Sequence, residues 1–469
     1  MTISSWSGQH SRERGQSASR AVGVGRFRRA PAVATLAVSM VVALPTSAAA
    51  APAVTILVSR ADGANGLVGD EDSFLPSTNA DGHLVAFQSN ANNLSADDND
   101  NVDNIFVRDV RNGRTRLVSR ADGANGAAAD NASTFPSISG ENRVAFQSRA
   151  TNLSAVDLDA VEDVFARDVG DGTTVLVSRT NGISGAAGDG DSGFASISQS
   201  GRFVAFQSDA DNLSANDNNA VTNVFVRDLQ NGSTRLVDRA NGTNGAAADA
   251  GAAFPSVSAD GRYVAFESAA DNLSANDDDA VTNVFVRDVQ NGTTRLVSRA
   301  DGSNGDGADD GSSNPSISGN GRYVAFESNA DNLSGNDNDN VSNVFVRDLQ
   351  NGTTRLISRA SGTNGAGADD ASLSASISGN GRYVAFESLA DNLSADDDNN
   401  VFNVFVRDLD QRATTLVSRA SGTNGPGGND SSNFPAMSAD GGSVAFQSAA
   451  DNLSAEDDDN VLNIFVRLR

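Results

Sequence analysis

The chain has 469 residues, no Cys, and 60 acidic against 34 basic residues, which gives a formal net charge of -26 at pH 7. The lack of Cys excludes disulfides as a source of stability, and the acidic balance with no basic cluster after residue 50 excludes a nucleic-acid-binding face, since phosphate binding needs a basic surface. The length would allow several ordinary domains, but that expectation fails when repeats close into one ring.

The first fifty residues differ from the rest of the chain. Six Arg residues precede an apolar run, Ala30–Leu44, and small residues around Ala50 follow it. This order is typical of a secretory signal peptide, and the run is shorter than the roughly 20 residues of a membrane span. We predict that residues 1–50 are a signal peptide and that the mature chain, 51–469, is secreted or associated with the cell envelope. An uncleaved anchor is the alternative, and an Arg pair before the run leaves Sec and twin-arginine export both open.

Three short strings recur along the rest of the chain with a period of 60 residues, 59 once, and each occurs seven times. The L-[VI]-[SD]-R strings end at Arg60, Arg120, Arg179, Arg239, Arg299, Arg359 and Arg419. The V-A-F-x-S strings begin at Val85, Val144, Val204, Val264, Val324, Val384 and Val444. The [VI]-F-[VA]-R strings begin at Ile105, Val164, Val224, Val284, Val344, Val404 and Ile464. All are rich in Val, Ile and Phe and are bounded by Gly, Asn, Asp and Ser, which predicts strands.

A P-S-I-S-like stretch, such as Pro315–Ser318, precedes each V-A-F-x-S string. It is one more candidate strand and would be the first strand of its blade. Dipeptides such as Asp260-Gly261 and Asn291-Gly292 separate the first strand from the second and the third from the fourth, and they supply the positive φ angles of tight hairpins. Four short strands in each of seven repeats predict an all-β, seven-bladed β-propeller with four antiparallel strands per blade.

The phase of the repeats predicts how the ring closes. The mature chain starts with an isolated fourth strand, Val54–Arg60, and stops after a third strand, Asn463–Arg469. Pairing these two strands would complete the last blade and remove two exposed sheet edges, which invite aggregation. We therefore expect one cooperative domain over 51–469.

The segment S-A-D-G-R-Y-V-A-F-E-S at 258–268, followed by N-V-F-V-R-D at 283–288, resembles the TolB-like, WD-repeat-like propeller repeat. The resemblance covers all seven repeats. It implies an exported propeller that binds proteins. TolB proteins have six blades, whereas seven are predicted here, so the resemblance does not extend to a TolB-specific partner, and a repeat motif reports fold and not function.

The predicted loops between the second and third strands share an acidic pattern, D-x-[DN]-x-V-x-[ND]. Its first positions are Asp98, Asp157, Asp217, Asp277, Asp337, Asp397 and Asp457. Its second positions are Asp100, Asp159, Asn219, Asp279, Asp339, Asn399 and Asp459. Its third positions are Asn104, Asp163, Asn223, Asn283, Asn343, Asn403 and Asn463. Alternating oxygen ligands of this kind suit Ca²⁺, which takes six to eight oxygens, so seven equivalent calcium sites are one interpretation.

The second interpretation is that these side chains cap their own backbone in Asx-turns. It is favoured by a Val, such as Val281, at the position where a calcium-binding EF-hand loop has Asp or Asn. The pattern leaves both interpretations open.

Enzymatic interpretations find less support. The string Gly190–Gly193 is similar to a serine-protease nucleophile motif, but that chemistry needs a His base, and His83, the only His after residue 50, falls in a predicted turn. We predict a non-catalytic binding or scaffold module that acts as a monomer and presents its acidic loop face to a protein or an extracellular polymer. The alternative is a carboxylate-based, glycosidase-like hydrolase of a polymer, with two Asp or Glu residues near the central channel.

Overall fold

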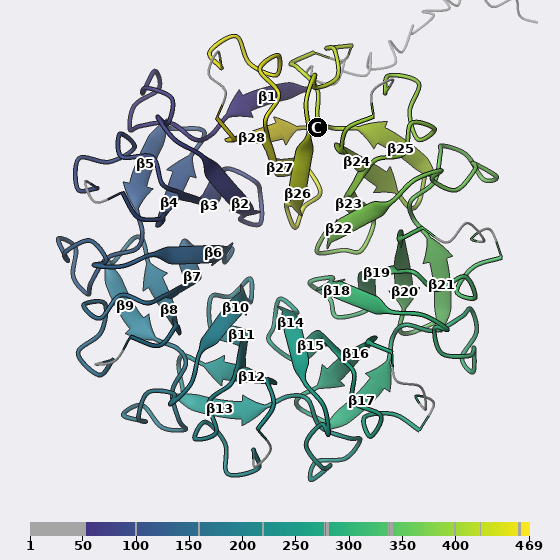
Figure 1. Cartoon of the computed structure of the whole chain (residues 1–469), viewed down its shortest axis with the longest axis horizontal. Helices are drawn as coiled ribbons and strands as arrows, with labels where there is room; N and C mark the ends of the chain where they lie inside the picture. Colours follow the sequence, from purple (N-terminus) through teal and green to yellow (C-terminus); the bar gives the residue numbers. More distant parts are fainter. Residues whose placement is uncertain are drawn as a thin grey trace, which may run out of the picture. The chain divides into compact units, whose positions relative to one another are not determined.

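The structure is a computed structural model that describes residues 53–469 except 99–100, 158–159, 218–219, 276, 278–280, 336, 338–340, 398–399, 423 and 458–460. Its described residues form 28 strands in seven four-stranded antiparallel sheets, which are arranged as the blades of a ring (Figure 1). The predicted seven-bladed propeller is confirmed. The predicted signal peptide, 1–50, lies outside the described residues. Among those described, no helix is long and apolar enough to span a bilayer.

The blades are numbered in chain order, and the strands of each blade are given from the centre of the ring outwards. Blade 1 comprises β2 (Ser73–Thr78), β3 (Leu84–Ser89), β4 (Asn104–Asp109) and β5 (Arg114–Leu117). Blade 2 comprises β6 (Ser133–Ile138), β7 (Arg143–Ser148), β8 (Asp163–Asp168) and β9 (Thr173–Leu176). Blade 3 comprises β10 (Ser192–Ile197), β11 (Phe203–Ser208), β12 (Asn223–Asp228) and β13 (Ser233–Leu236). Blade 4 comprises β14 (Ala252–Val257), β15 (Tyr263–Ser268), β16 (Asn283–Asp288) and β17 (Thr293–Leu296).

Blade 5 comprises β18 (Ser312–Ile317), β19 (Tyr323–Ser328), β20 (Asn343–Asp348) and β21 (Thr353–Leu356). Blade 6 comprises β22 (Ser372–Ile377), β23 (Tyr383–Ser388), β24 (Asn403–Asp408) and β25 (Ala413–Leu416). Blade 7 comprises β26 (Ser432–Met437), β27 (Ser443–Ser448), β28 (Asn463–Leu468) and, as its outer strand, β1 (Val54–Leu57).

The core lies between successive blades. The second and third strands of each blade place two Phe side chains opposite each other, as in the pair Phe266 and Phe285, whose ring centroids are 5.8 Å apart. Both rings are fully buried, and they pack with Val and Leu side chains into clusters that each join one blade to the next. Burial of apolar surface between sheets is therefore what holds the ring together, at about 25 cal/mol per Å².

The closure of the ring is confirmed. Strand β1 pairs antiparallel with β28 in a register that places Val54 opposite Leu468 and Leu57 opposite Phe465. The Val58 N–H continues this pairing by donating to the Ile464 carbonyl at 2.7 Å. The first and last strands of the propeller thus complete one sheet.

The fourth strands are shorter than predicted. The strand expected over Val54–Arg60 ends at Leu57, and Arg60 makes only a single bridge to Val68 as the chain turns into the link between blades. The Arg60 guanidinium donates to the Gly66 carbonyl inside that link, and the Arg at the end of every L-[VI]-[SD]-R string does the same in its own link. The first residue of each string is therefore the end of a strand, and its final Arg belongs to the link between blades.

A buried Arg ties each blade to the link that precedes it. In blade 4, Arg287 is 4% exposed and donates to the carbonyl oxygens of Arg239, Ala240 and Gly242 and to the Thr294 hydroxyl. Equivalent contacts are made by Arg108, Arg167, Arg227, Arg347, Arg407 and Arg467. Burial lowers the pKa of the equivalent Arg227 to about 10, so that side chain is still charged at neutral pH.

Candidate functional site

The predicted acidic loops are joined to the sheet by hydrogen bonds between their first and third positions. In blade 4, Asn283 Nδ2 donates to Asp277 Oδ1 at 3.0 Å, and both side chains are buried. The Ser298 hydroxyl donates to Asn283 Oδ1 at 2.6 Å, which links the loop to the chain after the fourth strand. The amide-to-carboxylate contact recurs at 2.9–3.1 Å in blades 1, 3, 5, 6 and 7.

The second positions of the pattern, by contrast, all lie outside the described residues: Asp100, Asp159, Asn219, Asp279, Asp339, Asn399 and Asp459. No group of three acidic or His side chains suited to a metal is found among the residues that are described. Between the first and third positions the contact is one side chain to another, and both interpretations of the pattern stand. Calcium binding by the complete loops stays the alternative interpretation.

A melting experiment tests it. We expect the melting temperature of the propeller to be the same in calcium and in chelator, because Asn Nδ2 already occupies an Asp oxygen that a cation would need. Metal binding to the native state alone would raise the free energy of unfolding by RT ln(1 + [L]/Kd), about 2.7 kcal/mol per site at 100 times Kd. A calcium-dependent rise that disappears when Asp277 and its six equivalents are changed to Ala would contradict this expectation and establish the loops as metal sites.

One blade departs from the Ser–Asn pair. In blade 3, Asp238 stands where Ser298 stands in blade 4. Its carboxyl group is completely buried; Oδ1 accepts the Val224 N–H at 2.9 Å, and Oδ2 has no hydrogen-bond partner among the described residues. Burial raises the pKa of Asp238 well above its usual value. The group therefore favours the protonated form, in which it can donate a hydrogen bond as the Ser hydroxyl does.

We expect Asp238→Ser to stabilise the protein at neutral pH. The pKa of Asp238 is raised by folding, so its ionisation in the unfolded chain lowers the free energy of unfolding as the pH rises above the unfolded pKa. Removing a poorly satisfied buried polar atom is worth about 1–3 kcal/mol. Thermal melts at a series of pH values should show a gain near pH 7 that shrinks toward pH 4. A gain that does not depend on pH would contradict the assignment.

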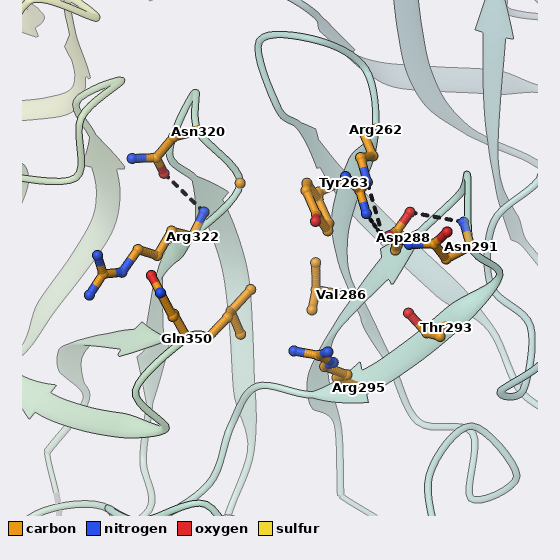
Figure 2. Close-up of a pocket in the computed structure, with 12 residues that line it drawn as sticks. Arg262, Tyr263, Val286, Asp288, Asn291, Thr293, Arg295, Asn320, Arg322 and Gln350 are labelled. Carbon is orange, nitrogen blue, oxygen red and sulfur yellow. Dashed lines mark hydrogen bonds and ion pairs between the residues drawn. The ribbon is translucent and has the colours of Figure 1, made fainter.

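Clefts between neighbouring blades occupy the face that carries the short hairpin turns. The cleft of about 410 Å³ between blades 4 and 5 is lined by Arg262, Tyr263 and Asp288 (Figure 2). Arg262 Nη2 lies 2.7 Å from Asp288 Oδ2, and its guanidinium lies 4.8 Å from the centre of the Tyr263 ring. Asp288 also accepts the Asn291 N–H of the next turn. Since the same Arg–Asp pairs recur in blades 3, 5 and 6, we assign them to the architecture.

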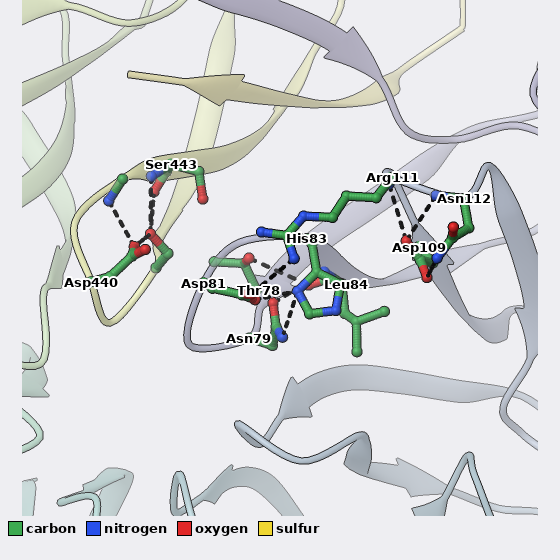
Figure 3. A network of polar contacts seen from close by, with 12 residues as sticks. Thr78, Asn79, Asp81, His83, Leu84, Asp109, Arg111, Asn112, Asp440 and Ser443 are labelled. Carbon is green, nitrogen blue, oxygen red and sulfur yellow. Dashed lines mark hydrogen bonds and ion pairs between the residues drawn. The ribbon is translucent and has the colours of Figure 1, made fainter.

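His83 takes the place of this Arg in blade 1, in the predicted turn. Its Nδ1 contacts the Asp81 carboxylate and Asn79, and Arg111 lies 3.2 Å from the same carboxylate (Figure 3). The Ser192 of the protease-like string is buried in β10, where its hydroxyl is hydrogen-bonded to Ser208. The two side chains lie in different blades and do not form a nucleophile–base pair.

The central opening of the ring is a site that the sequence did not single out. Each innermost strand has a bulge, and the residue at the bulge faces a shared cavity of about 350 Å³. All seven bulge residues have positive φ angles, between 48 and 53°. They are Leu75, Phe135, Phe194, Phe254, Asn314, Ser374 and Phe434. A left-handed backbone costs a bulky residue about 1–2 kcal/mol, so the local backbone conformation disfavours Leu and Phe at these positions.

A side chain from the preceding blade holds each bulge residue. The fourth residue of the V-A-F-x-S string accepts the backbone N–H of the next bulge residue, as when Gln147 accepts the Phe194 N–H at 2.7 Å. The string supplies Gln in four blades: Gln88, Gln147, Gln207 and Gln447. It supplies Glu in the other three: Glu267, Glu327 and Glu387. Seven equivalent bridges therefore run around the opening.

The opening itself is not symmetric. Blades 7, 1, 2, 3 and 4 provide an apolar arc, which we define as Phe434, Leu75, Phe135, Phe194 and Phe254. Within it, the Phe194 ring centroid lies 4.5 Å from that of Phe135 and 4.7 Å from that of Phe254. Blades 5 and 6 provide a polar arc, Asn314 and Ser374. The ring thus has one aromatic side and one polar side.

The three Glu bridges hold the two residues of the polar arc and Phe434, which follows the polar arc in the ring. Glu267 accepts the Asn314 N–H at 2.9 Å, Glu327 accepts the Ser374 N–H at 3.2 Å, and Glu387 accepts the Phe434 N–H at 2.6 Å. Burial raises the pKa of Glu267 and of Glu387, and hydrogen bonds to these carboxylates offset the rise only in part. At neutral pH, ionised carboxylates here lower the free energy of unfolding.

Two positions of the repeat are the ones that form this opening. The variable x of V-A-F-x-S is Gln or Glu in every repeat, and the bulge residue directly before the P-S-I-S-like stretch is Phe or Leu in five repeats and polar in two adjacent ones. Neither position stands out without knowing that both meet at the ring axis.

The chain matches no protein-family model and no curated protein sequence. Similar solved structures include TolB from Acinetobacter baumannii, with 13% identity over 77% of this chain and 67% of that one, at a TM-score of 0.38. An oligogalacturonate lyase in complex with manganese has 10% identity over 89% of this chain and 98% of that one, at 0.49. The β-propeller domain of the Trilobed protease from Pyrococcus furiosus has 11% identity over 84% and 95%, at 0.47.

These likenesses concern the fold, because identities this low carry no site residue from one chain to another. TolB proteins are among the structural neighbours, as the repeat resemblance implied. The chain is a seven-bladed β-propeller, similar in fold to TolB and other propellers.

Proposed function

We propose that this protein is a non-catalytic binding module and that its ligand binds in the central opening, not on the acidic loop face alone. The observation that carries the proposal is the apolar arc: Phe254 and Phe434 are 39% and 46% exposed beside an open cavity. Exposed clustered aromatic side chains are the usual anchors of protein interfaces.

The backbone supports the same proposal. The positions of Asn314 and Ser374 show that a polar residue fits the bulge conformation, and Asn adopts left-handed φ angles more readily than Phe. Folding therefore does not require Phe at the equivalent positions. Strained Phe at four of them, with Phe254 and Phe434 exposed and Phe135 and Phe194 half-buried, is better explained by a ligand that buries these rings.

A peptide-library selection tests the site. Phage-displayed random peptides are selected on the propeller and then measured against the variant F135N/F194N/F254N, which places at three positions the residue that blade 5 has naturally. We expect selected peptides to lose at least tenfold in affinity for the variant, since each Phe lost removes about 1.5–3 kcal/mol of burial. Undiminished binding by the variant would contradict the proposed site.

The hydrolase alternative has one observation in its favour, the presence of Glu267, Glu327 and Glu387 near the central channel. A raised pKa suits a general acid. Against it, each carboxylate accepts a backbone N–H where four blades use Gln for the same contact. Turnover of an extracellular polysaccharide that is lost on Glu→Gln substitution would favour the hydrolase over the binding module.

We further propose that the module is exported and acts as a single closed ring. Export rests on the signal-peptide pattern of residues 1–50. The monomeric state is supported by the outer strands, which are only four residues long and carry exposed charged side chains such as Arg295. Short charged edges resist pairing with another sheet. Size-exclusion chromatography with light scattering measures the state directly.

A further inference from the structure

Both residues of the polar arc are held by Glu bridges, and so is Phe434 beside it, whereas the other four residues of the apolar arc are held by Gln bridges. Gln bridges lead to Leu75, Phe135, Phe194 and Phe254, whereas Glu bridges lead to Asn314, Ser374 and Phe434. Both classes make the same contact to a backbone N–H. In this backbone contact Gln and Glu are equivalent, and what the three Glu bridges add to it is negative charge, placed in three adjacent blades.

This charge is costly where it stands. Glu387 is 5% exposed, and burial raises the pKa of Glu267 and of Glu387, which disfavours their ionised forms. A Gln at each position would avoid that cost, as Gln147 does in blade 2. Three carboxylates nevertheless lie at one side of the open cavity. Charges with little exposure are only weakly screened by solvent, so their electric field can act on a ligand in the cavity, and we take this as the reason for Glu at these positions.

The polar arc transmits the charge to the cavity. Asn314 Nδ2 donates to the Glu327 carboxylate, which can only accept hydrogen bonds. This fixes the orientation of the exposed Asn314 carboxamide and leaves its oxygen as the group available to a ligand. The Ser374 backbone N–H donates to the same Glu327 carboxylate. The arc thus offers acceptors, backed by negative charge, to a ligand that brings hydrogen-bond donors.

We propose that the central opening binds a short peptide segment of another protein in which a Lys or Arg lies next to an apolar residue. The basic side chain lies against Asn314 and Ser374, in the field of Glu267, Glu327 and Glu387, and the apolar side chain packs on Phe135, Phe194 and Phe254. The cavity of about 350 Å³ suits a few side chains rather than a folded surface. The net charge of -26 attracts such a segment at long range. This inference rests on the proposed function.

Defined peptides test the inference. Four synthetic peptides carry Leu-Lys, Leu-Arg, Leu-Gln or Leu-Glu between the same Gly and Ser residues, and fluorescence anisotropy measures their affinity at physiological ionic strength. We expect both basic peptides to bind at least tenfold more tightly than the Gln peptide. The variant E267Q/E327Q/E387Q should abolish that preference and leave the affinity for the Gln peptide unchanged. It should fold normally, because four blades already use Gln.

Two further variants make the result decisive. The variant D249N/D309N/D369N removes the same number of charges from exposed positions that precede the same three blades, and we expect it to keep the preference for basic peptides. If it loses the preference as E267Q/E327Q/E387Q does, or if no basic peptide binds, the inference is overturned. If library-selected peptides depend on the Phe side chains but contain no basic residue, the inference fails and the proposed function stands. Binding that survives in F135N/F194N/F254N overturns the proposed function itself.

Discussion

A chain that starts at Ser59 instead of Ala51 should lose its cooperative thermal transition or melt more than about 10 °C lower. The truncation removes β1, whose Leu57 is buried, and the completely buried Val58. Each such side chain contributes about 1.5–3 kcal/mol, against a total stability of about 5–15 kcal/mol for a typical domain. It also removes the Thr55 hydroxyl that accepts from Arg467 and exposes β28 as an edge.

Addition in trans provides the control for this truncation. A synthetic peptide of residues 51–58 should restore part of the lost melting temperature, because it can pair with β28 in the native register. The same peptide with Leu57→Asp should not, since the change places a charge in the core. Equal melting of the truncated and untruncated chains would show that the pairing of β1 with β28 does not hold the ring closed.

Arg287→Ala should lower the free energy of unfolding by at least about 3 kcal/mol. It removes three hydrogen bonds from a charged guanidinium to the carbonyl oxygens of Arg239, Ala240 and Gly242, and a hydrogen bond to a charged group is worth about 1.5–3 kcal/mol. Arg287→Lys should recover only part of the loss, because an ammonium group cannot reproduce the planar fork of donors. Chemical denaturation with urea measures these differences.

The matched control is Arg295→Ala, on the neighbouring outer strand of the same blade. Arg295 is exposed, whereas Arg287 is buried, so we expect its loss to change the free energy of unfolding by less than about 0.5 kcal/mol. Equal effects of the two substitutions would show that general charge, and not the contacts with the link, accounts for the stability lost with Arg287.

The repeats allowed most of the fold to be predicted. Apolar strings bounded by turn residues indicated the strands, and the offset between Val54 and Arg469 indicated how the ring closes; the structure confirms both. The predicted fourth strands were too long because the pattern cannot separate a residue in a ladder from one that follows it. At Arg60 the side chain bonds to Gly66 inside the link, a contact that becomes visible only in three dimensions.

The candidate site shows a different limit. Reasoning from near-identical repeats favoured seven equivalent acidic loops, and in six of them the structure places the first and third positions in hydrogen bonds with each other. The opening that we propose as the binding site depends on small differences between repeats, Gln147 against Glu327 and Phe194 against Asn314. In the sequence alone, these differences cannot be told from neutral variation between repeats.

The sequence by itself determined the all-β class, the number of blades, the strand order and the closure of the ring, because these depend on local patterns and their period. Only the tertiary structure decided that residues about 60 positions apart converge on one axis, and that the three Glu bridges lie in adjacent blades around the polar arc. The physical reason is that each bridge joins a side chain of one blade to the backbone of the next. Such a contact has no trace in the pattern of a single repeat.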